Sequence, residues 1–289
     1  MDLPGRSKLR VRQICETDLP EIADLLACGF PVRSRQFWLR ILECLAERSS
    51  PPGLPRYGYL LEQDRIVGVI LLIFATVRQG DSTTTRCNVS SWYVVPGFRS
   101  YAGLLVAKAL ARKNVTYLNV TPSPNTLPIL KAQGYLQYSQ GIFAAAPVLQ
   151  LRFSENVRIS EAKAYRPAHA DQFDHDLLID HAKYGCISVW CEATGRTYPL
   201  VFRPKVVKGV VGCAQLVYCR DVNDFVRFAG PVGRFLALRG RLLVLMDSNG
   251  PIPGLIGKYL GGKSPKYFKG PNRPGLGDLA YTEVALFDM

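Results

Sequence analysis

Hydrophobic and polar positions in the first 147 residues alternate between the two-residue period of strands and the three-to-four-residue period of helices. The strand pattern covers residues 9–15, 57–62, 65–77, 88–95 and 115–120. The helical pattern covers residues 17–26, 34–47, 101–112 and 123–133, and Thr17 is the predicted N-cap of the first helix. The order β-α-α-β-β-β-α-β-α-β contains hairpins and crossover helices, and it therefore indicates an α/β fold with a mixed sheet.

The second half of the chain repeats features of the first at an offset of 127 residues. Tyr101-Ala102-Gly103 recurs as Phe228-Ala229-Gly230, and the strand pattern at 116–120 recurs at 243–247. Both matched strands follow a helical pattern of the same length. A duplicated unit explains this internal repeat, and chance similarity between two strand–helix segments is the alternative.

Length and composition agree with two folded domains. The chain has 289 residues, of which 48% are hydrophobic and 20% charged, so wholesale disorder is excluded. Two domains of roughly 100–150 residues each can bury a core. We expect them at residues 1–150 and 151–289, with the junction near 154–163.

The most informative segment runs from Trp92 to Leu105, where a strand, a turn and a helix start follow one another. Such a junction collects main-chain N–H groups at the positive end of a helix dipole, which suits a diphosphate. A phosphate that approaches the backbone closely needs small residues in the turn. Arg99 adds a fixed positive charge to the same turn.

Here the sequence resembles the GCN5-related N-acetyltransferase (GNAT) family. The family has a strand ending in Val-x-Pro, then an aromatic residue, then Arg or Gln-x-x-Gly-x-Gly/Ala at a helix start. Val94-Val95-Pro96, Phe98 and Arg99 match this motif, while Ala102 and Leu104 stand at its two small positions. The family's second signature, an Asn-led helix ending in Gly and an aromatic residue, is similar to the segment from Asn125 to Gly134-Tyr135. The resemblance covers about residues 8–147.

The resemblance implies a fold of two GNAT-like lobes, each a mixed, mostly antiparallel and splayed sheet flanked by helices, the second lobe being degenerate. It also implies an enzyme in which a substrate amine attacks the thioester of acetyl-CoA or another acyl-CoA. By this carry-over the N–H of Val94 or Val95 polarises the thioester carbonyl. The expected cofactor-binding residues are Trp92, Tyr93, Val94, Val95, Arg99, Ser100, Tyr101, Ala102, Gly103, Leu104 and Asn125.

Two residues depart from the family pattern. Leu104 places a branched side chain at a small position, and Leu130 stands where the family often has a tyrosine that protonates the departing thiolate. Loss of a general acid typically lowers the reaction rate by about 10²–10⁴-fold. Tyr93, Tyr135 or water are the candidate substitutes, so we assign no catalytic residue. A catalytically silent CoA-binding or interaction module is therefore the alternative to an acyltransferase.

The loop at residues 228–234 is the second lobe's counterpart of the cofactor turn. Pro231 removes one N–H group, and Asp221 and Asp224 would repel a diphosphate. We interpret this copy as structural, covering the first lobe and helping to wall the acceptor pocket. The opposite assignment, with the cofactor in the second lobe, is the alternative.

The formal net charge is +13, from 36 basic and 23 acidic residues spread over both halves. Such an excess favours an anionic partner such as nucleic acid, anionic lipid or a phosphate-bearing cofactor, or it is a solvated surface without a special partner. Residues 250–275 combine four lysines with three aromatic residues. This segment is interpreted as a solvated connector, a loop over the acceptor pocket or a single-stranded nucleic-acid site. Nucleic-acid binding ranks last among the functions.

The remaining signals concern environment and partners. The eight cysteines include no Cys-x-x-Cys pair, which favours free thiols and a cytoplasmic location. No signal peptide or membrane span is visible, so no membrane partner is expected. His169, His175 and His181 are six residues apart, so we expect a solvated helix face and no metal. The expected partners are acyl-CoA and a small-molecule or peptide amine; the oligomeric state stays open.

Overall fold

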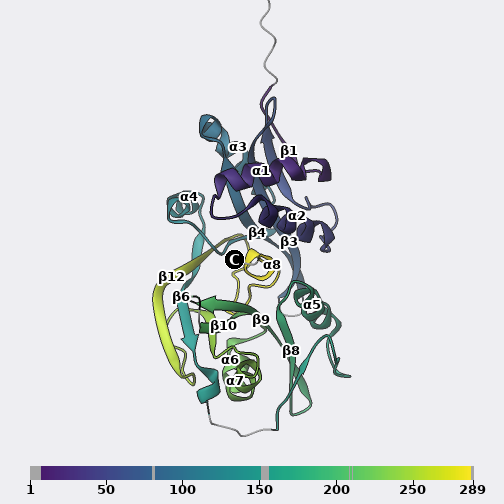
Figure 1. Ribbon diagram of the computed structural model, residues 1–289, viewed down its shortest axis with the longest axis vertical. Coiled ribbons are helices and arrows are strands. Elements are labelled where there is room, and N and C mark those ends of the chain that lie inside the picture. The colour runs from purple at the N-terminus through teal and green to yellow at the C-terminus, as the bar shows by residue number, and fades with distance from the viewer. Residues whose placement is uncertain (1–7, 80–81, 151–155, 208, 210, 288–289) are drawn as a thin grey trace, which may run out of the picture. The chain divides into compact units, whose positions relative to one another are not determined.

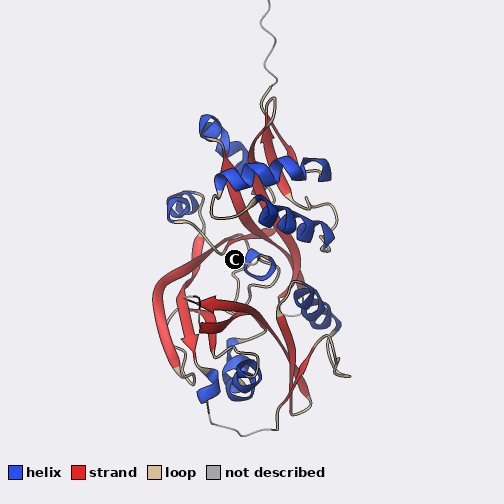
Figure 2. Cartoon of the chain, in the orientation of Figure 1, coloured by secondary structure: helices blue, strands red, loops and turns tan. Residues whose placement is uncertain are grey.

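The computed structural model describes residues 8–79, 82–150, 156–207, 209 and 211–287 (Figure 1). The chain forms two compact units. Unit 1 contains Met1–Asn119 and Lys269–Asn272, and unit 2 contains Val120–Phe268 and Arg273–Met289. In both units helices lie against strands, as Figure 2 shows.

The sheet of unit 1 follows the chain order, β1-β2-β3-β4-β5. Its strands are β1 (Arg10–Gln13), β2 (Gly58–Glu62), β3 (Ile66–Gln79), β4 (Ser82–Val94) and β5 (Val115–Asn119). The first four pair antiparallel, and β5 lies parallel to β4. The parallel step is possible because a helical crossover connects β4 to β5.

Helices cover this sheet and bury its aliphatic side chains. They are α1 (Leu19–Gly29), α2 (Arg35–Glu47), the 3-10 helix η2 (Pro96–Tyr101) and α3 (Ala102–Ala109). Ser34 caps α2 by accepting the N–H of Phe37. The predicted cap at Thr17 is wrong, because Glu16–Asp18 form a 3-10 turn and Asp18 precedes α1 as its N-cap.

Unit 2 has the strand order β12-β6-β11-β10-β9-β8-β7. The strands are β6 (Leu136–Ala145), β7 (Arg158–Glu161), β8 (Ile187–Ala193), β9 (Arg196–Val207), β10 (Val211–Cys219), β11 (Leu243–Ser248) and β12 (Gly257–Lys269). The helices are α4 (Leu127–Ala132), α5 (Gln172–Lys183), α6 (Val222–Arg227), α7 (Ala229–Ala237) and α8 (Glu283–Leu286), with 3-10 turns η3 (Pro124–Thr126) and η4 (Pro147–Leu149). Aromatic and aliphatic residues of β8–β11, α6 and α7 form its core.

The two units share one strand plan. From β7 to β10 the strands pair antiparallel in chain order, and β11 lies parallel to β10 after the α6–α7 crossover. This repeats the β1–β5 arrangement and is consistent with a tandem pair; duplication itself stays a prediction. The α/β fold with mostly antiparallel sheets and flanking helices is confirmed.

Strand β6 explains why the units divide differently from the predicted domains. It precedes residue 150 in the chain, yet it lies between β11 and β12 and belongs to unit 2. The predicted boundary at residue 150 stays a prediction. Residues 154 and 155 of the expected junction region lie outside the described residues.

Two expectations about polar segments were wrong. Residues 257–269 form strand β12 and are not a connector or loop, and Lys266 is buried in an ion pair with Asp247. Along α5, His181 is fully buried, because its Nδ1 contacts the carbonyl of Leu177 and its Nε2 accepts the N–H of Tyr281. That face of the helix therefore packs inside unit 2 and is not solvated.

Candidate functional site

Strands β4 and β5 separate along the sheet of unit 1. Their parallel ladder runs from Thr85, opposite Val115, to Asn88, opposite Leu118, and then stops. Strand β4 continues to Val94 and stays paired with β3 throughout. Among the described residues no strand pairs with the other edge of β4 beyond Asn88. The last part of β4 therefore presents main-chain groups at an open edge of the sheet.

A β-bulge immediately precedes this open edge. Val89 lies opposite Leu72 and Trp92 opposite Ile70, so β4 has one residue more than β3 in this interval. A bulge bends a strand and increases its twist locally. The sequence pattern contains no signal for it, because Ser90 and Ser91 read as ordinary strand positions.

The register decides which main-chain N–H groups face the open edge. Val95 donates its N–H to the carbonyl of Val67 over 2.9 Å, on the β3 side. Successive N–H groups of an antiparallel strand point to opposite edges. The N–H of Val94 therefore faces away from β3, as does that of Trp92. Of the two amides expected to polarise a thioester, Val95 is already engaged and Val94 is the one that remains.

The turn after β4 is a 3-10 helix that continues directly into α3. Its hydrogen bonds engage the N–H of Phe98 with Val95 and that of Ala102 with Arg99. The Ala102 amide is thus not available to a phosphate in this conformation. Gly97 carries the first N–H of the turn, since Pro96 has none, and a Cβ added there would meet nothing within 4 Å. The sequence-based site omitted Gly97, although the Pro-Gly step after a strand could have indicated it.

The side chains of this turn face solvent. Arg99, Ser100 and Gly103 are exposed, and Arg99 has no hydrogen bond or ion pair with any described residue. Leu104 is 49% exposed, so about half of its side chain faces solvent. Tyr101 is exposed as well and lies near the ring of Phe98. The turn therefore combines a free guanidinium with open approach to the backbone.

Two buried polar atoms on the α3 side of the sheet have no hydrogen-bond partner among the described residues. They are Nε1 of Trp92 and Oδ1 of Asn119. Trp92 shares its face with Tyr59, over which Lys108 of α3 lies. Asn119 is two residues after Tyr117, whose hydroxyl accepts the N–H of Arg112 just after α3. Both atoms thus belong to the face and the strands that border the split. No sequence pattern singled out Asn119.

Tyr93 is positioned by packing on the opposite face of β4. A Cβ on Gly29 would lie 2.4 Å from its ring, so the ring rests directly on the end of α1. Phe30 and Trp38 continue this aromatic group. Gly29 is therefore required for the close approach that fixes Tyr93.

The remaining expected residues lie in unit 2. Asn125 is in η3, and Leu130 is buried in α4 with its carbonyl accepting the N–H of Tyr135. Leu130 offers no proton, as the sequence indicated. A role for Asn125 beside the cofactor stays a prediction.

The second unit's counterpart of the turn is closed by packing. The segment is helical, and a Cβ on Gly233 would lie 2.4 Å from main-chain atoms of Pro147 and Val148. Gly230 is buried too. Arg220, at the end of β10, is held by Asp174 of α5 with an Nε–Oδ2 distance of 3.1 Å. These glycines serve helix packing, and this supports the structural interpretation of the second copy.

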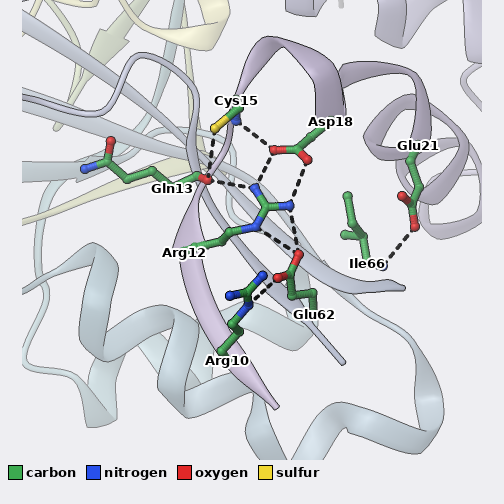
Figure 3. Close-up of polar contacts among 8 residues, drawn as sticks. All are labelled: Arg10, Arg12, Gln13, Cys15, Asp18, Glu21, Glu62 and Ile66. Carbon is green, nitrogen blue, oxygen red and sulfur yellow. Dashed lines mark hydrogen bonds and ion pairs between the residues drawn. The ribbon is translucent and has the colours of Figure 1, made fainter. Parts of the chain in front are cut away.

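A separate charged cleft lies beside β1 in unit 1, and Figure 3 shows its contacts. Arg12 contacts both Asp18, at 2.6 Å, and Glu62, at 2.8 Å. The hydrogen bonds from Arg12 hold the pKa of both carboxyls below their usual values. Arg10 also binds Glu62. The charges neutralise one another, so this network ties β1 to β2 and to the start of α1.

Thiol and metal signals add no further site. All eight cysteines are free, and Cys87, Cys186, Cys191, Cys213 and Cys219 are buried. Within the described ranges, no three His, Cys, Asp or Glu side chains gather into a metal-binding group. No helix in the described part of the chain is long and apolar enough to cross a membrane.

Comparison with known proteins identifies the fold through structure. No protein-family model and no curated protein sequence matches the chain. A GCN5-related N-acetyltransferase from Kribbella flavida matches with a TM-score of 0.56 and 15% identity, covering 91% of this chain and 71% of that one. A GCN5-related N-acetyltransferase from Anabaena variabilis matches with a TM-score of 0.59 and 10% identity, covering 90% of this chain and 72% of that one. Eis1 from Mycobacterium abscessus matches with a TM-score of 0.52 and 13% identity, covering 91% of this chain and 73% of that one.

These matches extend over both units of the chain. Nine-tenths of the residues superimpose on a single chain of each neighbour. The chain therefore has the fold of GCN5-related N-acetyltransferases, as the motif at Val94–Arg99 predicts. At 10–15% identity the likeness establishes the fold alone.

Proposed function

We propose that this chain, which has the fold of GCN5-related N-acetyltransferases, is an acyl-CoA-dependent N-acyltransferase with its cofactor along the open edge of β4. The split between β4 and β5 beyond Asn88 carries this proposal. A pantetheine arm contains two amides and can pair with an open strand edge as a further strand would. Trp92 and Val94 supply the outward main-chain groups for that pairing.

The Val94 N–H has the role of an oxyanion donor in this proposal. When the substrate amine attacks the thioester carbon, charge develops on the carbonyl oxygen, and a fixed N–H stabilises that charge. The tetrahedral intermediate then collapses, the C–S bond breaks, and the amine loses a proton. The CoA thiolate, which leaves the acyl carbon, takes up a proton from water because Leu130 cannot provide one, and the proton lost by the amine passes to water. Acetyl-CoA or a longer acyl-CoA is the proposed donor.

The diphosphate would meet a cation and a small number of amides at η2. Arg99 is exposed and unpaired among the described residues, and Gly97 leaves its N–H approachable. Because the Ala102 amide is engaged, this cradle offers fewer donors than the sequence motif predicts. We therefore expect Arg99 to provide a larger part of the phosphate affinity than main-chain groups do.

The test is calorimetric titration with acetyl-CoA, CoA and longer acyl-CoAs. Arg99→Glu is expected to weaken binding at least tenfold, since a charge contact of this kind contributes about 1.5–3 kcal/mol. Arg40→Glu makes the same charge change on an exposed position of α2 and is expected to bind like the parent protein. Absence of heat with every acyl-CoA, or an equal loss in both variants, contradicts the proposal.

A silent CoA-binding module is the second candidate, and Leu130 favours it. Release of free thiol from acetyl-CoA with any member of a panel of amines excludes that candidate. Binding without thiol release across the panel favours it. Acceptors to include are small amines and peptides with free amino termini or lysines.

A further inference from the structure

The outer edge of β10 in unit 2 is occupied by the chain's own C-terminal residues. Cys219 donates its N–H to the carbonyl of Gly277 over 2.9 Å, and Leu279 donates its N–H to the carbonyl of Val217 over 2.7 Å. Asp278 forms an antiparallel bridge with Tyr218 between these bonds. We call residues 277–287 the C-terminal strap. It adds a short strand to β10.

The strap lies where the strand plan of unit 2 would otherwise leave a split. The parallel ladder of β10 with β11 ends at Gln215 opposite Leu245. Strand β9 fills the other edge of β10, and a bulge interrupts that pairing between Leu216 and Tyr218. Unit 1 has the same sequence of features along β4, namely the end of the parallel ladder, a bulge and then an edge. In unit 1 that edge is open, and in unit 2 the strap pairs with it.

Further contacts hold the strap in place within unit 2. Tyr281 donates its N–H to Nε2 of buried His181 over 3.0 Å, and the carbonyl of Ala285 accepts from Arg203. Leu279, Ala280, Ala285, Leu286 and Phe287 are buried at 5% exposure or less. Figure 1 labels α8, which is part of the strap, in yellow. The strap is therefore a firmly docked part of the unit.

We propose that the C-terminal strap is an internal occupant of the second unit's cofactor edge and that it restricts the chain to one acyl-CoA site. It supplies β10 with the main-chain pairing that a pantetheine arm supplies to β4, and so it excludes that ligand. This inference rests on the proposed function, because it assumes that the open edge of β4 binds acyl-CoA.

Two glycines offer a matched pair of variants. Gly277 is buried with φ of +77°, and a Cβ there would lie 2.6 Å from Sγ of Cys219. Gly277→Val therefore pushes the strap from β10. Gly275 is exposed two residues earlier, and a Cβ there meets nothing within 4 Å, so Gly275→Val is the control.

The experiment counts acetyl-CoA by calorimetry and follows main-chain hydrogen exchange in the full-length protein. The parent protein and Gly275→Val are expected to bind one acetyl-CoA, which protects the end of β4 and leaves Cys219 and Leu279 unchanged. In Gly277→Val the amides of Cys219 and Leu279 exchange rapidly, and a second binding event appears. It should be about tenfold weaker, because Asp221 and Asp224 at the start of α6 oppose a diphosphate.

Several outcomes overturn the inference separately from the proposed function. Two sites in the parent protein, or faster exchange of Leu279 when acetyl-CoA binds, show that the strap does not exclude the ligand. A single site in Gly277→Val despite rapid exchange at Cys219 overturns it as well. If the parent protein binds none, the proposed function fails, and the strap inference, which assumes that β4 binds acyl-CoA, fails with it; the outcomes named before this one overturn the strap inference while the proposed function stands. If Gly277→Val does not fold, the parent's count and exchange pattern decide.

Discussion

Units 1 and 2 have the same strand order, but they differ at the end of the strand that pairs with a parallel neighbour. This strand is β4 in unit 1 and β10 in unit 2. Strand β4 ends beside an open edge and a solvent-exposed turn, whereas β10 ends beside the C-terminal strap and a packed helix. In the first case Arg99 has no hydrogen bond or ion pair with a described residue, whereas in the second Arg220 is bound to Asp174. The comparison teaches that a ligand site in this fold depends less on the strands than on what the chain places against their edge.

Removal of Lys266 in unit 2 should have the largest effect. Its ammonium lies 2.7 Å from Asp247, and both side chains are at most 4% exposed. Lys266→Met leaves a buried carboxylate without its cation, which costs about 3–5 kcal/mol of unfolding free energy. Denaturant unfolding measures this. Because the pair itself contributes little net stability, adding Asp247→Leu to this variant should recover most of the loss; no recovery would contradict this account.

Alanine at one glycine in the crossover helix of each unit, Gly233 in α7 and Gly103 in α3, should have the next largest effect. Gly233→Ala forces a Cβ against the backbone of η4, and the strain is expected to cost about 1–3 kcal/mol. Gly103→Ala in α3 meets nothing within 4 Å and should stabilise by about 0.4–1 kcal/mol. Thermal unfolding of both variants compares them directly. Equal losses would mean that the open turn of unit 1 is packed in solution.

Acid should act on unit 1 through the network around Arg12. The pKa values of Asp18 and Glu62 are lowered in the folded state, mainly by hydrogen bonds from Arg12. Their contribution is therefore complete above the unfolded values of about 4 and is lost as the pH falls through the lower folded values. Asp18→Asn should remove about 1 kcal/mol of the unfolding free energy that the parent protein loses on acidification. The melting temperature of the variant should therefore depend less on pH.

Asp24 provides the control for that measurement. It pairs with Arg35 on the surface, and both side chains are about half exposed. Asp24→Asn should leave the dependence of melting temperature on pH unchanged, since exposed pairs contribute little. If both variants change it equally, general surface charge and not the Arg12 network is responsible.

Local patterns in the sequence predicted most elements of the fold because apolar spacing and caps act over few residues. The helix over Arg35–Glu47 with its Ser34 cap and the strand–turn–helix at 92–105 followed from such patterns. Long-range pairing did not. The insertion of β6 beside β11 and the strand character of residues 257–269 depend on partners more than 90 residues away.

The residues proposed for the site were selected from the sequence for the same reason. Val94-Val95-Pro96 and Arg99 indicated a strand–turn–helix junction that the structure contains, and a binding role for it stays a prediction; the choice of Val94 over Val95 needed the register with β3. Asn119 was not selected because a strand end carries no chemical motif, and Gly97 was not selected because the Pro-Gly step was interpreted only as the end of a strand. The strap was invisible in the sequence, since Gly277–Leu279 resemble any loop until β10 is placed beside them.

The open edge of β4 also determines what kind of selectivity the site can have. The outward main-chain groups of Trp92 and Val94 can hydrogen-bond to water before a ligand binds, so a ligand that pairs with them exchanges with that water. Each exchange gains only about 0.5–1.5 kcal/mol. The edge therefore selects a molecule by the spacing of its amides and contributes little to its affinity. If an acyl-CoA pairs with this edge as we propose, recognition by spacing tolerates different chain ends, and variation in the acyl group should change the affinity little along β4.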